Sequence, residues 1–169
     1  MIGNDIIDLE QTRTESNWKR RGFLEKIFTE NEQQLILSAD NQELMVWNLW
    51  SRKEAAYKIY NRQTTERLFI PRRLECSSTF TEKGHFFGQV KIDRFTYFTR
   101  TIVQNSKIYT EAVTNLNDFQ RIIAIDIEDV YKNNDGIPNA VVTNNPVSIT
   151  HHGRFERRIQ LDINSQSRL

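Results

Sequence analysis

The stretch that most constrains this chain is Trp50-Ser-Arg-Lys-Glu-Ala-Ala-Tyr-Lys58. It has no Gly or Pro and consists mostly of good helix formers, so it predicts a helix. Glu54 and Lys58 are four residues apart and share one helical face, with Trp50 on the same side. A carboxylate and an ammonium group on one face can hold a divalent cation and a phosphate together. An ordinary solvated Glu–Lys pair is the simpler alternative.

A second acidic element near the start of the chain favours the metal interpretation. The segment Gly3-Asn-Asp-Ile-Ile-Asp-Leu9 carries two acids among residues with strand character. Asp5 is therefore expected on a largely buried strand, where a carboxylate is costly unless it is paired or bound to a cation. The alternative is that Asp5 caps the following turn. Asp8 is expected to be structural.

Size and composition exclude several classes of protein. The chain has 169 residues, a single-domain length, and 38% hydrophobic residues can form a core. Its 23 basic and 22 acidic residues leave a net charge of +1, which argues against nucleic-acid binding driven by bulk charge. The single cysteine, Cys76, cannot form an internal disulfide, and no apolar run approaches the ~20 residues of a membrane span. We therefore expect a cytoplasmic protein with no membrane partner.

Helices are predicted in the first half of the chain. Thr29 followed by Glu32 fits a capping box, which predicts a helix from Thr29 to Ser38. A longer helix is predicted from Glu43 to Tyr60, packed on more than one side, with a narrow polar opening at Glu54 and Lys58. The basic residues 10–28 form either a solvated face or a surface for an acidic partner.

Strands are predicted from Leu74 onwards, where the hydrophobic period changes. The expected order is an antiparallel meander, a short helix at Leu116–Arg121, a strand at Ile122–Tyr131 and a last strand near residues 146–151. The meander consists of Phe86–Ile92, Phe95–Val103 and Lys107–Val113, with turns at 82–84, 93–94 and 105–106.

The last strand carries polar side chains at its end. Ser148 and Thr150 alternate with apolar residues, and the strand opens into His151, His152 and Arg154. Hydroxyls, imidazoles and a guanidinium at a strand end can contact an anion. Adjacent histidines point to opposite sides of an extended chain, so these two are not expected to share one metal.

Four motifs in this order resemble the 4′-phosphopantetheinyl transferase superfamily, the holo-(acyl-carrier-protein) synthases. They are Gly3-Asn4-Asp5, the Trp50–Lys58 helix, Gly136-Ile137-Pro138 and Ser148-Ile149-Thr150-His151. The resemblance implies an α+β fold with an antiparallel sheet packed on a long helix. We expect one domain over residues 1–169, with a strand-rich insertion at about 70–115.

The resemblance also implies a reaction: Mg²⁺-dependent transfer of 4′-phosphopantetheine from coenzyme A to a serine of an acidic acyl or peptidyl carrier protein, as in fatty-acid biosynthesis. Asp5 and Glu54 would hold Mg²⁺, and Lys58 would neutralise charge on the pyrophosphate. Glu54 or a metal-bound water would take the serine proton.

The remaining contacts are assigned by the same resemblance. Ser148, Thr150 and His151 would contact coenzyme A together with Lys58, and the region Arg13–Arg21 would meet the carrier.

This chain departs from the shorter synthases after the helix, where Asn61-Arg62-Gln63-Thr64 replaces a glycine-rich turn. It carries one set of motifs, as in the short type whose sites form between subunits, so a homotrimer is expected. Two alternatives stay open. One is a Mg²⁺-dependent nuclease or phosphohydrolase, and the other is a non-catalytic protein-binding module that uses a free strand edge.

Overall fold

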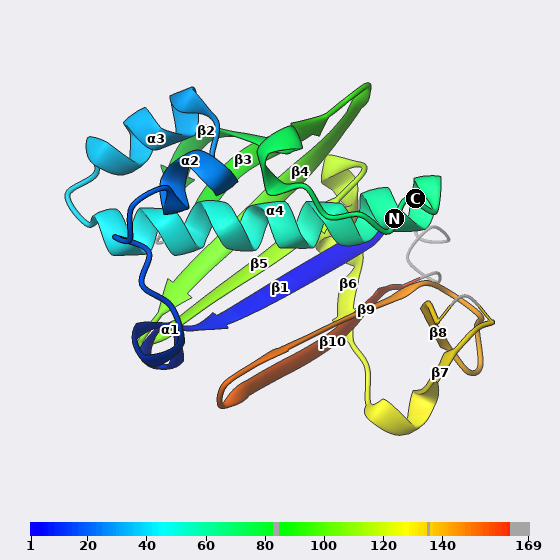
Figure 1. Cartoon of the computed structure of the whole chain (residues 1–169). Helices are drawn as coiled ribbons and strands as arrows, with labels where there is room; N and C mark the ends of the chain where they lie inside the picture. Colours follow the sequence, from blue (N-terminus) through cyan, green and yellow to red (C-terminus); the bar gives the residue numbers. More distant parts are fainter. Residues whose placement is uncertain (83–84, 135, 163–169) are drawn as a thin grey trace.

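A five-stranded antiparallel sheet packed on a long helix forms the centre of the protein (Figure 1). The computed structural model describes residues 1–82, 85–134 and 136–162. The strand order is β1-β5-β4-β3-β2. The bounds are β1 Ile2–Asp8, β2 Glu75–Glu82, β3 His85–Ile92, β4 Phe95–Gln104 and β5 Lys107–Val113. The predicted meander and the strand at the start of the chain are thereby confirmed.

The first half of the chain supplies the helices, with bounds α1 Leu9–Glu15, α2 Phe23–Ile27, α3 Glu30–Leu37 and α4 Gln42–Thr64. The predicted capping box is present, since Thr29 accepts from the Glu32 amide and Glu32 accepts from the Thr29 amide. α4 begins after the cap Asn41 and runs about one turn beyond the predicted end. It stops where Thr65 adopts a left-handed conformation with φ 60°.

β1 joins the sheet through β5, in a register from Ile2 opposite Val113 to Asp8 opposite Lys107. α4 crosses β1 so closely that a Cβ atom on Gly3 would lie 2.0 Å from the Ala55 carbonyl oxygen. Glycine is thus required here by packing. The strands expected as an insertion at about 70–115 follow α4 in sequence and, together with β1, build the sheet that α4 covers. The single-domain boundary itself stays a prediction.

The last third of the chain forms a smaller unit beside β1 (Figure 1). A three-stranded sheet has the order β6-β10-β9, and β7 pairs with β8. The bounds are β6 Ile122–Ala124, β7 Val130–Lys132, β8 Pro138–Ala140, β9 Val147–His152 and β10 Phe155–Leu161, with short 3-10 helices η1 Pro71–Arg73, η2 Leu116–Arg121 and η3 Ile127–Asp129. η2 confirms the predicted short helix.

The prediction of one strand over Ile122–Tyr131 is wrong. Pairing with β10 ends at Ile125, whose amide donates to the Arg158 carbonyl, and the chain then turns at Asp126 into η3. Val130 and Tyr131, at the end of the predicted strand, pair with β8 instead. The alternation of hydrophobic residues therefore spans two short strands, β6 and β7, with η3 between them. Part of one predicted turn, residues 83–84, lies outside the described residues, as does residue 135 beside the Gly136-Ile137-Pro138 motif.

The core lies between α4 and the sheet and includes Leu49, Ala55 and Ile59 of α4 with Val90 and Ile108 of the strands. No helix in the described ranges is long and apolar enough to cross a membrane.

Candidate active site

Asp5 of β1 and Glu54 of α4 meet where the strand crosses the helix. Both line one cavity of about 210 Å³, together with Trp47, Trp50 and His151. Asp5 is buried and Glu54 is half-buried. The structure therefore brings together the two predicted metal ligands, which are 49 positions apart in the sequence.

Thr150 and Lys58 are both close to the Asp5 carboxylate. The Thr150 hydroxyl donates to Oδ1 of Asp5 at 3.2 Å, and Nζ of Lys58 lies 3.9 Å from the same oxygen. Burial raises the pKa of Asp5, and the positive charge of Lys58 opposes that rise. The carboxylate is thus costly to ionise in the absence of further positive charge.

The same surroundings make ionisation of the Glu54 carboxyl group unfavourable. Burial raises its pKa to about 7, the nearby Asp5 charge adds to the rise, and Lys58 opposes it. Two carboxylates and one lysine leave the site short of positive charge when all three are ionised. Within the described residues no group of three or more His, Cys, Asp or Glu side chains is placed to hold a metal. The available donor set is therefore two hard carboxylates.

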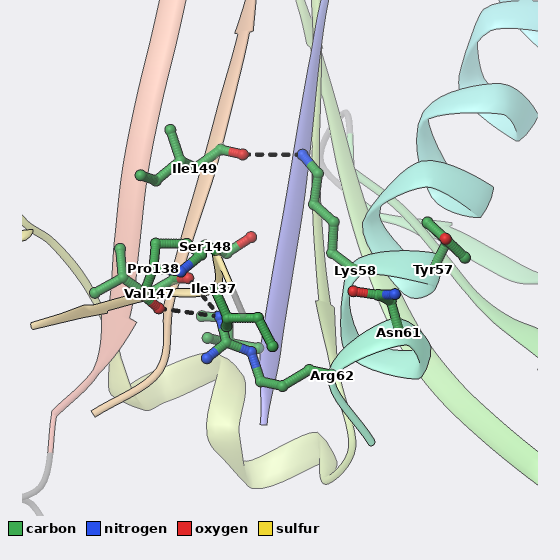
Figure 2. Close-up of a pocket in the computed structure, with 11 residues that line it drawn as sticks. Tyr57, Lys58, Asn61, Arg62, Ile137, Pro138, Val147, Ser148 and Ile149 are labelled. Carbon is green, nitrogen blue, oxygen red and sulfur yellow. Dashed lines mark hydrogen bonds between the residues drawn. The ribbon is translucent and has the colours of Figure 1, made fainter. Parts of the chain in front are cut away.

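Lys58 links α4 to both neighbouring strands. Its Nζ donates to the carbonyl oxygen of Ile149 at 3.0 Å (Figure 2). It also donates to the carbonyl oxygen of Asn4 at 2.6 Å. Burial lowers its pKa, whereas the charges of Asp5 and Glu54 act against the decrease. An ammonium group has three donors. One donor therefore stays available for a ligand oxygen.

β9 attaches to the free edge of β1 through its side chains. The amides of Asn4, Ile6 and Asp8 donate to Ser148 Oγ at 2.9 Å, Thr150 Oγ1 at 3.1 Å and His152 Nδ1 at 2.9 Å, respectively. The residues in contact are every second residue on both strands, because alternate residues of a strand point to one side. The sequence shows that polar residues alternate with apolar ones in β9, but it does not show that these polar side chains contact β1.

This arrangement separates the predicted coenzyme A contacts into two groups. The hydroxyls of Ser148 and Thr150 are buried and donate to Asn4 and Asp5, so they face β1. His151 is exposed and lines the cavity that contains Asp5 and Glu54.

The basic region lies beside this cavity. A neighbouring hollow of about 370 Å³ shares Trp47 and Trp50 with it and is also lined by Arg20 and Phe23. Arg13 is engaged by Glu43, with Nη2 2.9 Å from Oε2.

Sequence reasoning did not select Arg62, one helical turn beyond Lys58. Both residues line a third cavity of about 240 Å³ between α4 and β9, which Ile137 and Pro138 also line (Figure 2). Gly136 belongs to the same lining. The signal that could have found Arg62 is its spacing of four from Lys58.

The model of the 4′-phosphopantetheinyl transferase superfamily matches residues 1–113. No sequence among the curated proteins matches this chain. Among solved structures, the crystal structure of Thermotoga maritima holo-[acyl-carrier-protein] synthase is similar, with a TM-score of 0.49, 12% identity and coverage of 96% of this chain and 83% of that chain. Because the family model spans two thirds of the sequence, this chain belongs to the 4′-phosphopantetheinyl transferase superfamily, enzymes that act on coenzyme A and carrier proteins.

Proposed function

We propose that this protein transfers 4′-phosphopantetheine from coenzyme A to a serine of an apo acyl or peptidyl carrier protein in a Mg²⁺-dependent reaction. The observation that carries the proposal is the convergence of Asp5, Glu54 and Lys58 at the crossing of β1 and α4.

The two carboxylates suit a magnesium ion. Mg²⁺ prefers hard oxygen ligands and usually keeps several waters, so two protein carboxylates are a sufficient set. The raised pKa values of Asp5 and Glu54 record the cost of two neighbouring buried anions, which a divalent cation would relieve. When bound there, the ion would neutralise charge on the pyrophosphate of coenzyme A.

The side chains would then divide the reaction between them. The carrier serine oxygen attacks the phosphorus that bears pantetheine, and the bond from this phosphorus to the bridging oxygen breaks, which releases 3′,5′-ADP. Glu54 would accept the serine proton, since it is a carboxylate that lines the same cavity. Lys58 stabilises the negative charge that develops on the phosphate oxygens through its remaining donor. His151 lines the same cavity and would contact the pyrophosphate.

Ser148 and Thr150 would contribute to the site indirectly, because their hydroxyls face β1. Their hydroxyls fix β1, and Thr150 orients Asp5 directly. We propose that these two residues support coenzyme A binding by positioning Asp5 and the cavity wall.

The test is incubation of the purified chain with an apo carrier protein, coenzyme A and Mg²⁺. We expect the carrier to gain the mass of one phosphopantetheine, and addition of EDTA to abolish the gain. A wild-type protein that binds coenzyme A but leaves every class of apo carrier unmodified would contradict the proposal. Hydrolysis of nucleic acid or of the coenzyme A pyrophosphate in the same assay would instead support the phosphohydrolase alternative.

We further propose that the chain acts as a homotrimer in the cytoplasm and that the Arg13–Arg21 region meets an acidic carrier. Exposed apolar side chains on the C-terminal unit support self-association, namely Ile127, Val141 and Val142, which are 62%, 55% and 87% exposed. Light scattering should give the mass of three chains at assay concentration, and a fully active monomer would contradict it.

A further inference from the structure

The short helix α1 buries little of its surface. Of its seven residues only Thr12 is buried, and Leu9 packs against the core with part of its side chain. α1 nevertheless forms one wall of two cavities, since Thr12 lines both the cavity of Asp5 and Glu54 and the neighbouring hollow. A helix of this length is not stable in isolation, so contacts outside the helix must fix its position.

The turn of the β9–β10 hairpin supplies such contacts at the start of α1. This turn consists of Gly153 and Arg154 and lies at the same end of β1 as α1 (Figure 1). Arg154 forms a bidentate ion pair with Asp8, in which Nε donates to Oδ2 and Nη2 donates to Oδ1, both at 2.8 Å. Its Nη1 lies 2.7 Å from Oε2 of Glu10, and its Nη2 also donates to Oγ of Ser106 at 2.9 Å.

Asp8 joins the helix end and the hairpin turn through one carboxylate. It is the N-cap of α1 and accepts from the amides of Glu10 at 3.1 Å and Gln11 at 3.5 Å. Asp8 is buried, and the Arg154 guanidinium holds its pKa well below the usual range, so it stays ionised at neutral pH. A Cβ atom on Gly153 would lie 2.6 Å from Oδ2 of Asp8, so only glycine lets the turn approach this closely.

His152, the last residue of β9, contacts the other end of α1. Its Nδ1 accepts from the Asp8 amide at 2.9 Å, and its Nε2 lies 3.4 Å from Oε2 of Glu15. Because Nδ1 is an acceptor, the neutral ring carries its proton on Nε2, on the side of Glu15. The hairpin therefore holds α1 at its first turn through Arg154 and at its last residue through His152.

We propose that Arg154 and His152 are positioning residues that fix α1 and thereby hold the wall that the carrier protein meets. This inference rests on the function proposed above, in which the Arg13–Arg21 region contacts the carrier. α1 carries Arg13 and leads into this region, and Arg20 lines the hollow together with Glu15. A displaced α1 would change the shape of the hollow and the placement of these charges.

The catalytic residues should be insensitive to these contacts. β9 pairs with β10, and its hydroxyls accept from the amides of Asn4 and Ile6, so its position does not depend on the Arg154 side chain. Loss of Arg154 should therefore affect the carrier and not coenzyme A or Mg²⁺. The competing explanation is that the Arg154–Asp8 pair only stabilises the fold. Such a role would lower the melting temperature and leave the kinetics of the folded enzyme unchanged.

The experiment measures carrier modification against carrier concentration at saturating coenzyme A and Mg²⁺, and then against coenzyme A at saturating carrier, with every variant folded by circular dichroism. For Arg154→Met we expect the KM for the carrier to rise about 10- to 100-fold, the range for a misplaced contact surface. The kcat and the KM for coenzyme A should stay within about twofold of wild type. The matched control Arg158→Met breaks a pair with Glu156 within β10 and should behave as wild type.

Asp8→Asn separates the ion pair from the helix cap, because asparagine also caps helices but carries no charge. It should raise the KM for the carrier as much as Arg154→Met does. The double variant should be no worse than the worse single variant, since both changes break one pair. If Arg154→Met does not fold, Asp8→Asn carries the test, because it leaves no buried anion behind.

Hydrogen exchange gives a readout that does not depend on activity. Amides of α1 should exchange faster in Asp8→Asn and Arg154→Met, whereas those of α4 should exchange as in wild type. A wild-type KM for the carrier in the folded variants would overturn the inference, as would unchanged exchange in α1 or an equal rise in the KM for coenzyme A. Each of these results leaves the proposed function intact, which fails only if the wild-type chain modifies no carrier.

Discussion

Lys53 and Glu32 form an ion pair without exposed side-chain surface, with Nζ of the lysine 2.6 Å from Oε2 of the glutamate. Lys53 also donates to the carbonyls of Ile27 and Pro71, and Glu32 accepts from the amide of Cys76. The lysine that precedes Glu54 therefore ties α4 to α3 and to the start of β2. Because consecutive helical residues point about 100° apart, burial of Lys53 helps to turn Glu54 toward β1.

Replacing Lys53 should be severely destabilising. Lys53→Met leaves a buried carboxylate and several carbonyls without their cation, so we expect a loss of about 3–5 kcal/mol in the free energy of unfolding. The measurement is urea denaturation at pH 7. As a control, Arg13→Met breaks the exposed pair with Glu43 and should cost less than about 1 kcal/mol. A similar cost for the two variants would show that the buried pair is dispensable.

Asp5 and Glu54 should behave as one unit toward the metal. Asp5→Asn and Glu54→Gln should each remove most Mg²⁺-dependent carrier modification. The double variant should be little less active than the less active single variant, since one ion relies on both carboxylates. The measurement is the modification rate against Mg²⁺ concentration. Fully additive losses with an unchanged Mg²⁺ dependence would show that the two residues do not share an ion.

The raised pKa of Glu54 predicts how the metal-free protein responds to pH. Its folded pKa is about 7 against an ordinary value of 4.5, so the folded state binds more protons than the unfolded state between these values. Stability should therefore fall as the pH rises from about 4.5 to 7, with a Glu54 contribution of up to about 3 kcal/mol.

The comparison for this effect is Glu54→Gln, which cannot ionise. In EDTA it should be more stable than the wild type at pH 7.5 and should gain little at pH 4.5, as measured by urea denaturation. Mg²⁺ should reduce the wild-type deficit, because a cation favours the ionised carboxylate. Equal pH profiles for the two proteins would mean that Glu54 titrates as a solvated side chain.

Much of the fold followed from local signals. Hydrophobic period, the Thr29–Glu32 capping box and the turn residues near 93 and 105 located α3, α4 and the meander, because each of these features acts within a few residues. The strand predicted at Ile122–Tyr131 failed because its end depends on where β10 stops pairing. That information lies about 35 positions further along the chain.

Part of the candidate site could also be predicted from the sequence, because it too depends on signals between nearby residues. Glu54 and Lys58 share a helical face through their spacing, and the cost of burying Asp5 pointed to a partner. The contacts of Thr150 with Asp5 and of Arg62 with Val147 could not be predicted, since both depend on how β9 lies against β1 and α4. These are tertiary contacts over 80 or more residues.

Lys58 should act on the phosphate and not on the metal. Lys58→Ala should lower the rate of carrier modification strongly without reducing Mg²⁺ affinity, because it removes a positive charge beside Asp5. Lys58→Arg should restore part of the rate, since a planar fork replaces a point charge. Saturation curves for Mg²⁺ and coenzyme A on each variant separate the two effects. If Lys58→Ala bound Mg²⁺ more weakly than the wild type, Lys58 would act on the metal as well as on the phosphate.

Thr150 should position Asp5 through a single hydroxyl. That oxygen accepts from the amide of Ile6 and donates to Oδ1 of Asp5, and its bond holds the pKa of Asp5 lower than burial alone would. Thr150→Val preserves the shape of the side chain but leaves the Ile6 amide unpaired and Asp5 harder to ionise, at a cost of about 1–3 kcal/mol. Mg²⁺ should therefore bind more weakly, and the deficit should grow as the pH is lowered. Thr150→Ser retains the hydroxyl and serves as the matched control, with Mg²⁺ affinity close to wild type. A Thr150→Val variant that binds Mg²⁺ with unchanged affinity at every pH would show that Thr150 secures β9 to β1 and has no influence on the carboxylate.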